Sequence, residues 1–186
     1  IKSKKIINLS TISKLDLFNN NNITEECRLN NSNLLGLTKS TLDKLLKFQN
    51  IPNINLLLPG VITRDRKFER PYLKKLLYDL KSKSMIEIFN QHFPFNSFID
   101  TYELYKFINF IFIKKKLAQH EEYIFCPSGS TTINKIIKKF EIKYDKKIKI
   151  KNLGNNNNHY LLNNSKLKKK LKFNPSKVDE ILKRII

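Results

Sequence analysis

The chain has 186 residues, and its 36 Lys and Arg against 16 Asp and Glu give a formal charge of +20. Apolar residues make up 40% of it, with 13 Phe and 7 Tyr, which excludes a disordered polyelectrolyte. No apolar run approaches the roughly 20 residues of a membrane-spanning helix, and 2 Cys with 4 Gly exclude a disulfide scaffold or a collagen-like chain.

Hydrophobic periodicity predicts strands that alternate with helices. The expected elements are a strand over 5–9, a helix over 33–48, a strand over 54–58, a helix over 71–83, a strand over 86–89, an extended piece over 96–99, a helix over 102–115, a strand over 123–125, a helix over 130–140, a strand over 147–151 and two short final helices, the last from Pro175. Asn33 and Asn174 are the expected N-caps of the first and last helices, and Pro71 opens the second. The alternation predicts an α/β fold with a parallel sheet.

The positive charge has two explanations. The cations are nearly all Lys, and Lys, Asn and Ile together are typical of an AT-rich coding sequence, which predicts lysines on every solvated face. The alternative is a nucleic-acid-binding module that combines the charge with aromatic residues such as Phe110, Tyr144 and Phe173. No helix-turn-helix, zinc-finger or RNP-type signature supports that alternative.

Cys27 and Cys126 do not combine with the three His at any metal-ligand spacing, so we expect no metal site. No cationic stretch followed by a long apolar core precedes the first strand, so no signal peptide is expected. We therefore expect a cytoplasmic protein with reduced thiols and no membrane span.

Five segments in order resemble the C-terminal part of an extended short-chain dehydrogenase/reductase, of the NAD-dependent sugar-nucleotide epimerase/dehydratase family. Residues 6–13 resemble a strand that ends in a Ser/Thr motif, and residues 24–39 resemble "TE… N-x-Y-G-x-S-K". Residues 57–61 resemble "R-P-G-V", residues 96–104 resemble "F-I-H-V-x-D-L", and residues 165–175 resemble "S-K-x-x-x-x-L-G-F-x-P".

In that family a Tyr phenol moves the proton, a Lys four residues later lowers the phenol pKa, and a Ser or Thr shares the hydrogen bond to the reacting oxygen. The resemblance assigns the Lys to Lys39 and the Ser/Thr to Thr11, but the Tyr position holds Leu35, which carries no proton. The resemblance also implies that the chain binds NAD or NADP, and it assigns four residues to contacts with this cofactor. They are Ser10, Lys39, Pro59 and Val61.

The resemblance divides the chain into the end of a Rossmann-type NAD(P)-binding domain (1–62) and a small α/β substrate-binding cap (63–186), with some later segments packing back on the sheet. It implies a nucleotide-sugar substrate held by Arg64, Arg66, Arg70 and Asn96, surface-polysaccharide biosynthesis as the context, and a homodimer. The Gly-x-x-Gly-x-x-Gly turn that holds the cofactor pyrophosphate is missing from these residues. The chain is therefore expected to be impaired, and a noncatalytic sugar-nucleotide-binding subunit remains an alternative.

Overall fold

The computed structural model describes residues 5–17, 21–29, 34–48, 51–63, 72–113, 120–155 and 159–186. The strands are β1 (Ile6–Thr11), β2 (Asn22–Ile23), β3 (Asn53–Leu58), β4 (Gly60–Ile62), β5 (Met85–Ile88), β6 (Phe98–Asp100), β7 (His120–Ile124), β8 (Lys149–Asn152) and β9 (Leu161–Leu162). The helices are α1 (Leu34–Lys47), α2 (Tyr72–Ser82), α3 (Thr101–Ile113), α4 (Ile133–Tyr144), α5 (Ser165–Leu171) and α6 (Val178–Ile185), and a 3-10 turn, η1, spans Ile12–Lys14. The predicted α/β alternation is confirmed.

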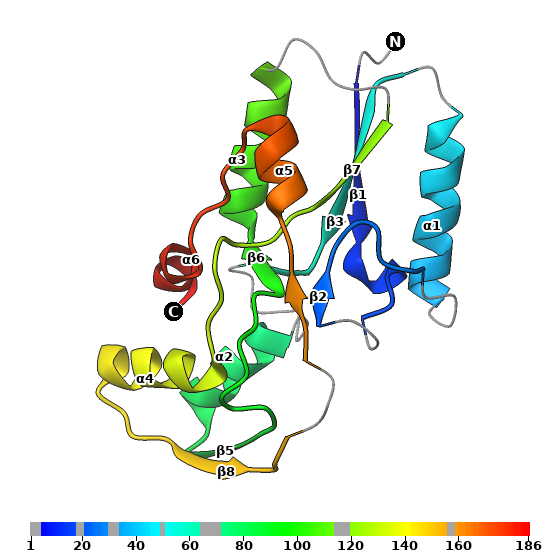
Figure 1. Cartoon of the computed structure of the whole chain (residues 1–186). Helices are drawn as coiled ribbons and strands as arrows, with labels where there is room; N and C mark the ends of the chain where they lie inside the picture. Colours follow the sequence, from blue (N-terminus) through cyan, green and yellow to red (C-terminus); the bar gives the residue numbers. More distant parts are fainter. Residues whose placement is uncertain are drawn as a thin grey trace.

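The central sheet has the order β1-β3-β7 and is parallel throughout, as predicted. Helix α1 covers one face, whereas α3 and α5 lie on the other (Figure 1). On the α3 face, apolar side chains such as Leu56 and Phe107 interlock, which fits the burial expected of a parallel sheet. Strand β7 comes from the 63–186 part of the chain and lies beside β3 in the sheet.

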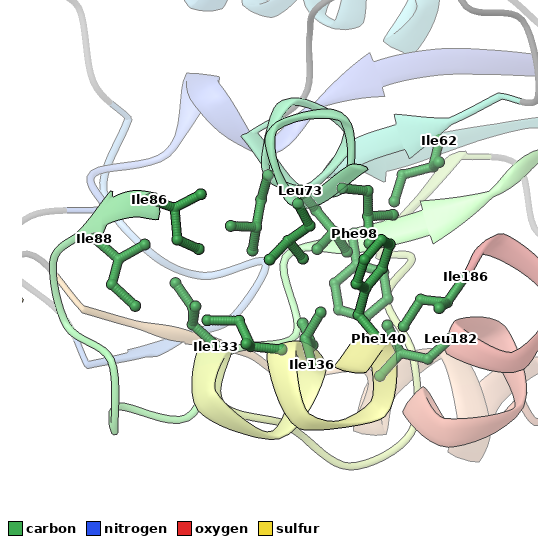
Figure 2. Close-up of a cluster of buried hydrophobic side chains, with 14 of the residues drawn as sticks. Ile62, Leu73, Ile86, Ile88, Phe98, Ile133, Ile136, Phe140, Leu182 and Ile186 are labelled. Carbon is green, nitrogen blue, oxygen red and sulfur yellow. The ribbon is translucent and has the colours of Figure 1, made fainter. Parts of the chain in front are cut away.

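A second hydrophobic core gathers α2, α4, α6 and the parallel pair β5–β8 (Figure 2). The predicted inward face of α4 is confirmed, because its four apolar residues at helical spacing are all buried. They are Ile133, Ile136, Ile137 and Phe140. The pair β4–β6 joins the two cores, since Ile62 and Phe98 belong to this one while Val61 and Ile99 pack into the core beside α3.

The predicted start of the last helix is wrong. Helix α6 begins at Val178 with Lys177 as N-cap, not at Pro175 behind Asn174. Long-range hydrogen bonds hold the preceding residues extended: the Ser176 amide donates to Glu103 (3.0 Å), and the Ser176 carbonyl accepts from the Ser128 amide (3.0 Å). The other predicted helix-start residues, Asn33 and Pro71, lie outside the described residues.

Helix α1 has the predicted extent but an unusual orientation. The residues it buries are Gly36 and Asp43, whereas Leu34 and Leu45 are 79% and 58% exposed. Its apolar stripe therefore faces away from the sheet, and its small and acidic positions face inward.

Candidate functional site

Thr11 ends β1 and begins a sharp turn. Its hydroxyl oxygen accepts a hydrogen bond from the Ser13 amide (3.1 Å), so it caps η1. A hydroxyl that accepts one bond keeps its own proton for donation. Thr11 lies beside Leu58 in the sheet register, so Pro59 follows at the same carboxyl end.

Lys39 reaches this end of the sheet from α1. Its Nζ donates to the Leu9 carbonyl oxygen over 2.9 Å, two residues before Thr11. The structure therefore brings the predicted Lys39 and Thr11 to the same stretch of β1. Leu35, one turn earlier on α1, is 54% exposed.

Ser10 points the other way, beneath α1. It is buried and donates to Asp43 Oδ2 (3.2 Å), so its hydroxyl is occupied within the fold. Val61 packs against the core beside α3, and Pro59 is buried at the junction of β3 and β4. Lys39 also belongs to the residues that the resemblance assigns to the cofactor, and its ammonium group lies at the β1 edge.

A buried ionic cluster fixes α1 to the sheet. Lys14 is 3% exposed and its Nζ contacts Asp43 (2.5 Å) and Glu122. Asn8 adds a hydrogen bond to Asp43 (2.8 Å) and another to Asn55 (2.9 Å). Buried charges need such pairing, because an unpaired ion in the interior is costly. The cluster thus determines where α1, and with it Lys39, lies.

A groove of about 260 Å³ opens beside the β2–β9 pair. Its polar lining is neutral and comes from segments far apart in sequence, namely Asn22, Asn96, Gly129, Ser130, Asn163 and Asn164. Ile23 and Leu162 pack with Leu57 and Ile124 near the ends of β3 and β7. The groove therefore lies at the carboxyl end of the sheet, where ligands bind in open α/β folds.

Asn96 is the predicted substrate residue that the structure describes, and it shapes this groove. Its Nδ2 donates to the Leu162 carbonyl and its Oδ1 accepts from the Leu162 amide, both over 2.9 Å. Both polar atoms of the amide are thus bonded to β9. Arg64, Arg66 and Arg70 lie outside the described residues.

Other groove residues were not predicted from the sequence. Gly129 has φ +80°, in the left-handed region that favours glycine, and the Pro127–Ser130 stretch is a turn pattern that signals it. Asn22 and Asn163 carry no comparable signal, because only the β2–β9 pairing brings them together.

Burial controls the ionisable groups near the groove. Desolvation raises the pKa of Glu25, although its carboxylate accepts from the Ile124 amide (2.7 Å). Burial also raises the pKa of the Cys126 thiol to about 12, so this cysteine is an unreactive thiol. Within the described residues, no group of three His, Cys, Asp or Glu is placed to hold a metal ion.

The structure limits the nucleic-acid alternative. Phe173 is buried and packs edge-on against Phe107, and Phe110 packs on Phe173. Neither ring is free to stack on a base. Tyr144 is exposed, with Lys81 and Lys143 each 5.7 Å from its ring centre. Across the described segments, no helix is long and apolar enough to cross a membrane.

A scan of family models finds no match, and a search of curated proteins finds no relative. Solved structures do match. The UDP-glucuronic acid 4-epimerase of Bacillus cereus, in complex with UDP-glucuronic acid and NAD, has a TM-score of 0.78 at 19% identity; the match covers 100% of this chain and 61% of the epimerase. The UDP-N-acetylglucosamine 4-epimerase of Methanobrevibacter ruminantium M1, in complex with UDP-N-acetylmuramic acid, has a TM-score of 0.78 at 19% identity, covering 98% and 61%.

A third solved structure is the dTDP-glucose 4,6-dehydratase of Bacillus anthracis in complex with NAD, with a TM-score of 0.73 and 13% identity over 97% of this chain and 60% of the dehydratase. The chain thus spans about three fifths of the length of these enzymes. At such identities the likeness establishes the fold. The chain has the Rossmann-like α/β fold that these sugar-nucleotide epimerases and dehydratases share.

Proposed function

We propose that the chain serves NAD(P)-dependent epimerisation, dehydration or reduction of a sugar nucleotide, in the cytoplasm and for surface-polysaccharide biosynthesis. One observation carries the proposal: Lys39 Nζ donates to the Leu9 carbonyl, two residues before Thr11 on β1. The groove lies at the same carboxyl end of the sheet. The fold shared with enzymes solved with UDP-sugars and NAD supports it.

The proposed roles follow from the chemistry of each group. Lys39 carries a positive charge that stabilises a developing oxyanion, and the Thr11 hydroxyl keeps a proton to donate to a sugar oxygen. Leu35 transfers no proton, so this chain binds and orients the sugar better than it turns it over. A noncatalytic sugar-nucleotide-binding subunit is the alternative that Leu35 favours.

NAD or NADP would accept the hydride when bound. Lys39 and Thr11 present donors that fit ribose and carboxamide oxygens, and Pro59 and Val61 follow β3 at the same end. The 4 Gly of the sequence form no Gly-x-x-Gly-x-x-Gly motif, so residues 1–186 contain no turn of the kind that holds the cofactor pyrophosphate.

Calorimetric titration of UDP- and dTDP-sugars into the chain, with and without NAD⁺, tests the proposal. We expect saturable binding that weakens in an Arg64→Ala/Arg66→Ala/Arg70→Ala variant and is unchanged in Lys44→Ala, an exposed control on α1. Absence of binding to any sugar nucleotide, beside tight and salt-sensitive binding to an oligonucleotide, would contradict it. Leu35→Tyr, assayed with the cofactor-binding part supplied, separates the enzyme from the binding subunit, because only the enzyme gains turnover.

We also propose a homodimer through the outer face of α1, formed by Leu34, Leu37, Leu45 and Phe48. All four side chains are exposed, three on α1 and Phe48 directly after its last residue, and an exposed apolar patch is typical of a protein–protein contact. Sedimentation equilibrium should show a dimer that Leu45→Lys dissociates. Tyr105→Lys, at an exposed aromatic residue of α3, is the matched control and should leave the dimer intact.

A further inference from the structure

Helix α1 is attached to the central sheet through polar groups. Among the described residues, none of the apolar side chains that build the three buried cores comes from α1. The helix buries Gly36 and Asp43, and the sheet residues beneath it are polar as well. Together with Asp43 they form what we call the polar layer, namely Asn8 and Ser10 of β1, Asn53 and Asn55 of β3, and Glu122 of β7. A helix-covered face of a parallel sheet is ordinarily apolar, so hydrogen bonds and ion pairs take the place of a shared apolar core here.

Lys14 supplies the positive charge of the polar layer. Its Nζ contacts the carboxylates of Asp43 on α1 and Glu122 on β7, and its side chain is almost fully buried. This pairing is complete only while both acids are ionised. A protonated acid would leave the Lys14 cation in the interior with too little compensating charge, which is costly. Acid therefore weakens the attachment of α1.

His120 places a second acid-sensitive group beside the polar layer. Its Nδ1 lies 2.5 Å from Asn53 Oδ1. The Asn53 amide nitrogen donates to the carbonyls of Leu46 and Ile51, both over 3.0 Å. Asn53 Oδ1 is therefore the acceptor, and His120 Nδ1 is the donor. The second ring nitrogen, Nε2, is then the atom that takes up a proton in acid.

The surroundings of His120 favour its neutral ring. Burial lowers its pKa below the ordinary value of 6.5, and the charges of Lys47 and Lys14 lower it further. The carboxylates of Glu122 and Asp43 act in the opposite direction without outweighing burial. The folded state thus binds this proton more weakly than the unfolded state. Its stabilisation is present above about pH 6.5 and is lost as the pH falls through the lower folded value.

We propose that α1 is a pH-controlled element, which stays on the sheet near neutral pH and is released when acid protonates the polar layer and His120. The described charged groups that face one another here are Lys14 of η1, Asp43 and Lys47 of α1, and His120 and Glu122 of β7. Near neutral pH, the two lysines balance the two carboxylates. In acid, both carboxylates become neutral and the imidazole becomes a third cation. Repulsion among the cations then opposes attachment, and the described apolar cores offer α1 no contact that replaces the lost pairing.

Release of α1 acts on the candidate site through Lys39. The Lys39 Nζ leaves the Leu9 carbonyl when the helix departs, so it no longer lies at the strand end that carries Thr11. The helix itself should unravel, because an isolated helix of 14 residues is marginal in water. The consequence for ligand binding rests on the proposed function, whereas the release itself does not. Sugar-nucleotide binding should decline over the same pH range in which α1 is released.

Amide hydrogen exchange of residues 1–186, corrected for the intrinsic effect of pH on exchange, tests the release. Between about pH 7.5 and about pH 5, we expect the protection of α1 amides to fall by about tenfold or more, while that of β3 and α4 changes by less than about threefold. Both of these elements are anchored in the buried apolar cores. Equal protection of α1 at the two pH values would overturn the inference, and so would a loss that spreads equally through β3 and α4.

Two variants identify the groups responsible. His120→Asn keeps a donor near the position of Nδ1 but takes up no proton, so the fall in α1 protection should shrink by about threefold or more. Lys14→Met/Asp43→Asn/Glu122→Gln removes the charges and keeps acceptors for the neighbouring donors, so its α1 should respond least to pH. His92→Asn, at an exposed histidine outside the layer, is the matched control and should respond like the parent. An undiminished pH response in both test variants would overturn the inference.

Calorimetric titration of UDP- and dTDP-sugars at the same two pH values separates the release from the proposed function. Release of α1 in a chain that binds no sugar nucleotide would support the inference and contradict the proposed function. Binding that declines in the parent but not in His120→Asn would support both. Binding of equal strength at both pH values, in a chain whose α1 is released, would support the release and remove Lys39 from the proposed site.

Discussion

Gly36 lies directly against the backbone of Ser13. A Cβ at Gly36 would stand 2.8 Å from the Ser13 carbonyl oxygen and 2.9 Å from Lys14 Cα. Both atoms are main-chain, so neither yields by rotating a side chain. The absence of a side chain at Gly36 lets α1 approach the turn that follows Thr11 and bring Lys39 within reach of Leu9.

We therefore expect Gly36→Ala to push α1 away from η1. The overpacking should lower the free energy of unfolding by about 2 kcal/mol. Urea denaturation followed by circular dichroism measures it, with Thr38→Ala on the exposed side of α1 as control, expected within about 0.5 kcal/mol of the parent. Equal stability of the two variants would show that the helix shifts without strain.

Lys14→Met removes the cation between Asp43 and Glu122. Two carboxylates then lose their partner under α1, and we expect a loss of about 3 kcal/mol in unfolding free energy. The double variant Lys14→Met/Asp43→Leu should recover part of that loss, because it removes one uncompensated charge. Lys44→Met, at an exposed position of α1, is the control. A double variant less stable than Lys14→Met would contradict the assignment of the loss to unpaired charge.

Arg184 secures α6 to the start of α3. Its guanidinium donates to Asp100 (2.6 and 3.3 Å) and to Glu103 (3.0 Å), and both carboxylates are buried. Arg184→Met should lower the unfolding free energy by about 3 kcal/mol. Lys183→Met, on the adjacent exposed residue, should leave it within about 0.5 kcal/mol, as measured by chemical denaturation.

Glu103 makes this clamp sensitive to acid. Burial tends to raise its pKa, but hydrogen bonds from Ser176 and Lys106 outweigh burial, so the pKa lies below its ordinary value of 4.5. The folded state thus binds this proton more weakly than the unfolded state. Its stabilisation is present above about pH 4.5 and is lost as pH falls through the lower folded value. A pH series of denaturation curves should show a flatter acid limb for Glu103→Gln, and identical limbs would refute this role.

Lys146 caps the C-terminus of α2. Its Nζ donates to the carbonyls of Leu80 (2.9 Å), Lys81 (3.1 Å) and Lys83 (2.9 Å). A cation is favoured at this end of a helix. Lys146→Met should cost about 1–2 kcal/mol of unfolding free energy, whereas the exposed neighbour variant Lys147→Met should change it little. Thermal denaturation distinguishes the two.

Local pattern predicts most of the secondary structure, and long-range pairing decides the rest. The spacing of Leu34, Leu42 and Leu45 predicts helix α1, but it does not reveal that the opposite side faces the sheet. That orientation depends on Lys14, whose partners lie 29 and 108 residues away. The same reason explains the late start of α6, where Ser176 is held by residues of α3 and the turn before α4.

The candidate site, too, could be predicted from the sequence only in part. The resemblance places Thr11 and Lys39 together, and the structure brings them to one strand end. The groove was not predicted beyond Asn96, because β2 and β9 are two-residue strands that no periodicity reveals. The arginines predicted for the substrate remain a prediction.

The contact between Arg184 and Asp100 spans 84 residues, and β1 must wait for β3 and then β7 before its sheet is complete. During synthesis the carboxylate of Asp100 emerges long before Arg184, and Glu103 has its near neighbour Lys106 well before it gains Arg184. The nascent chain therefore lacks the Arg184 clamp until α6 is made. Closing such distant contacts slows folding, and exposed strand edges invite aggregation meanwhile. For this chain, production at low temperature with chaperones should therefore improve the soluble yield.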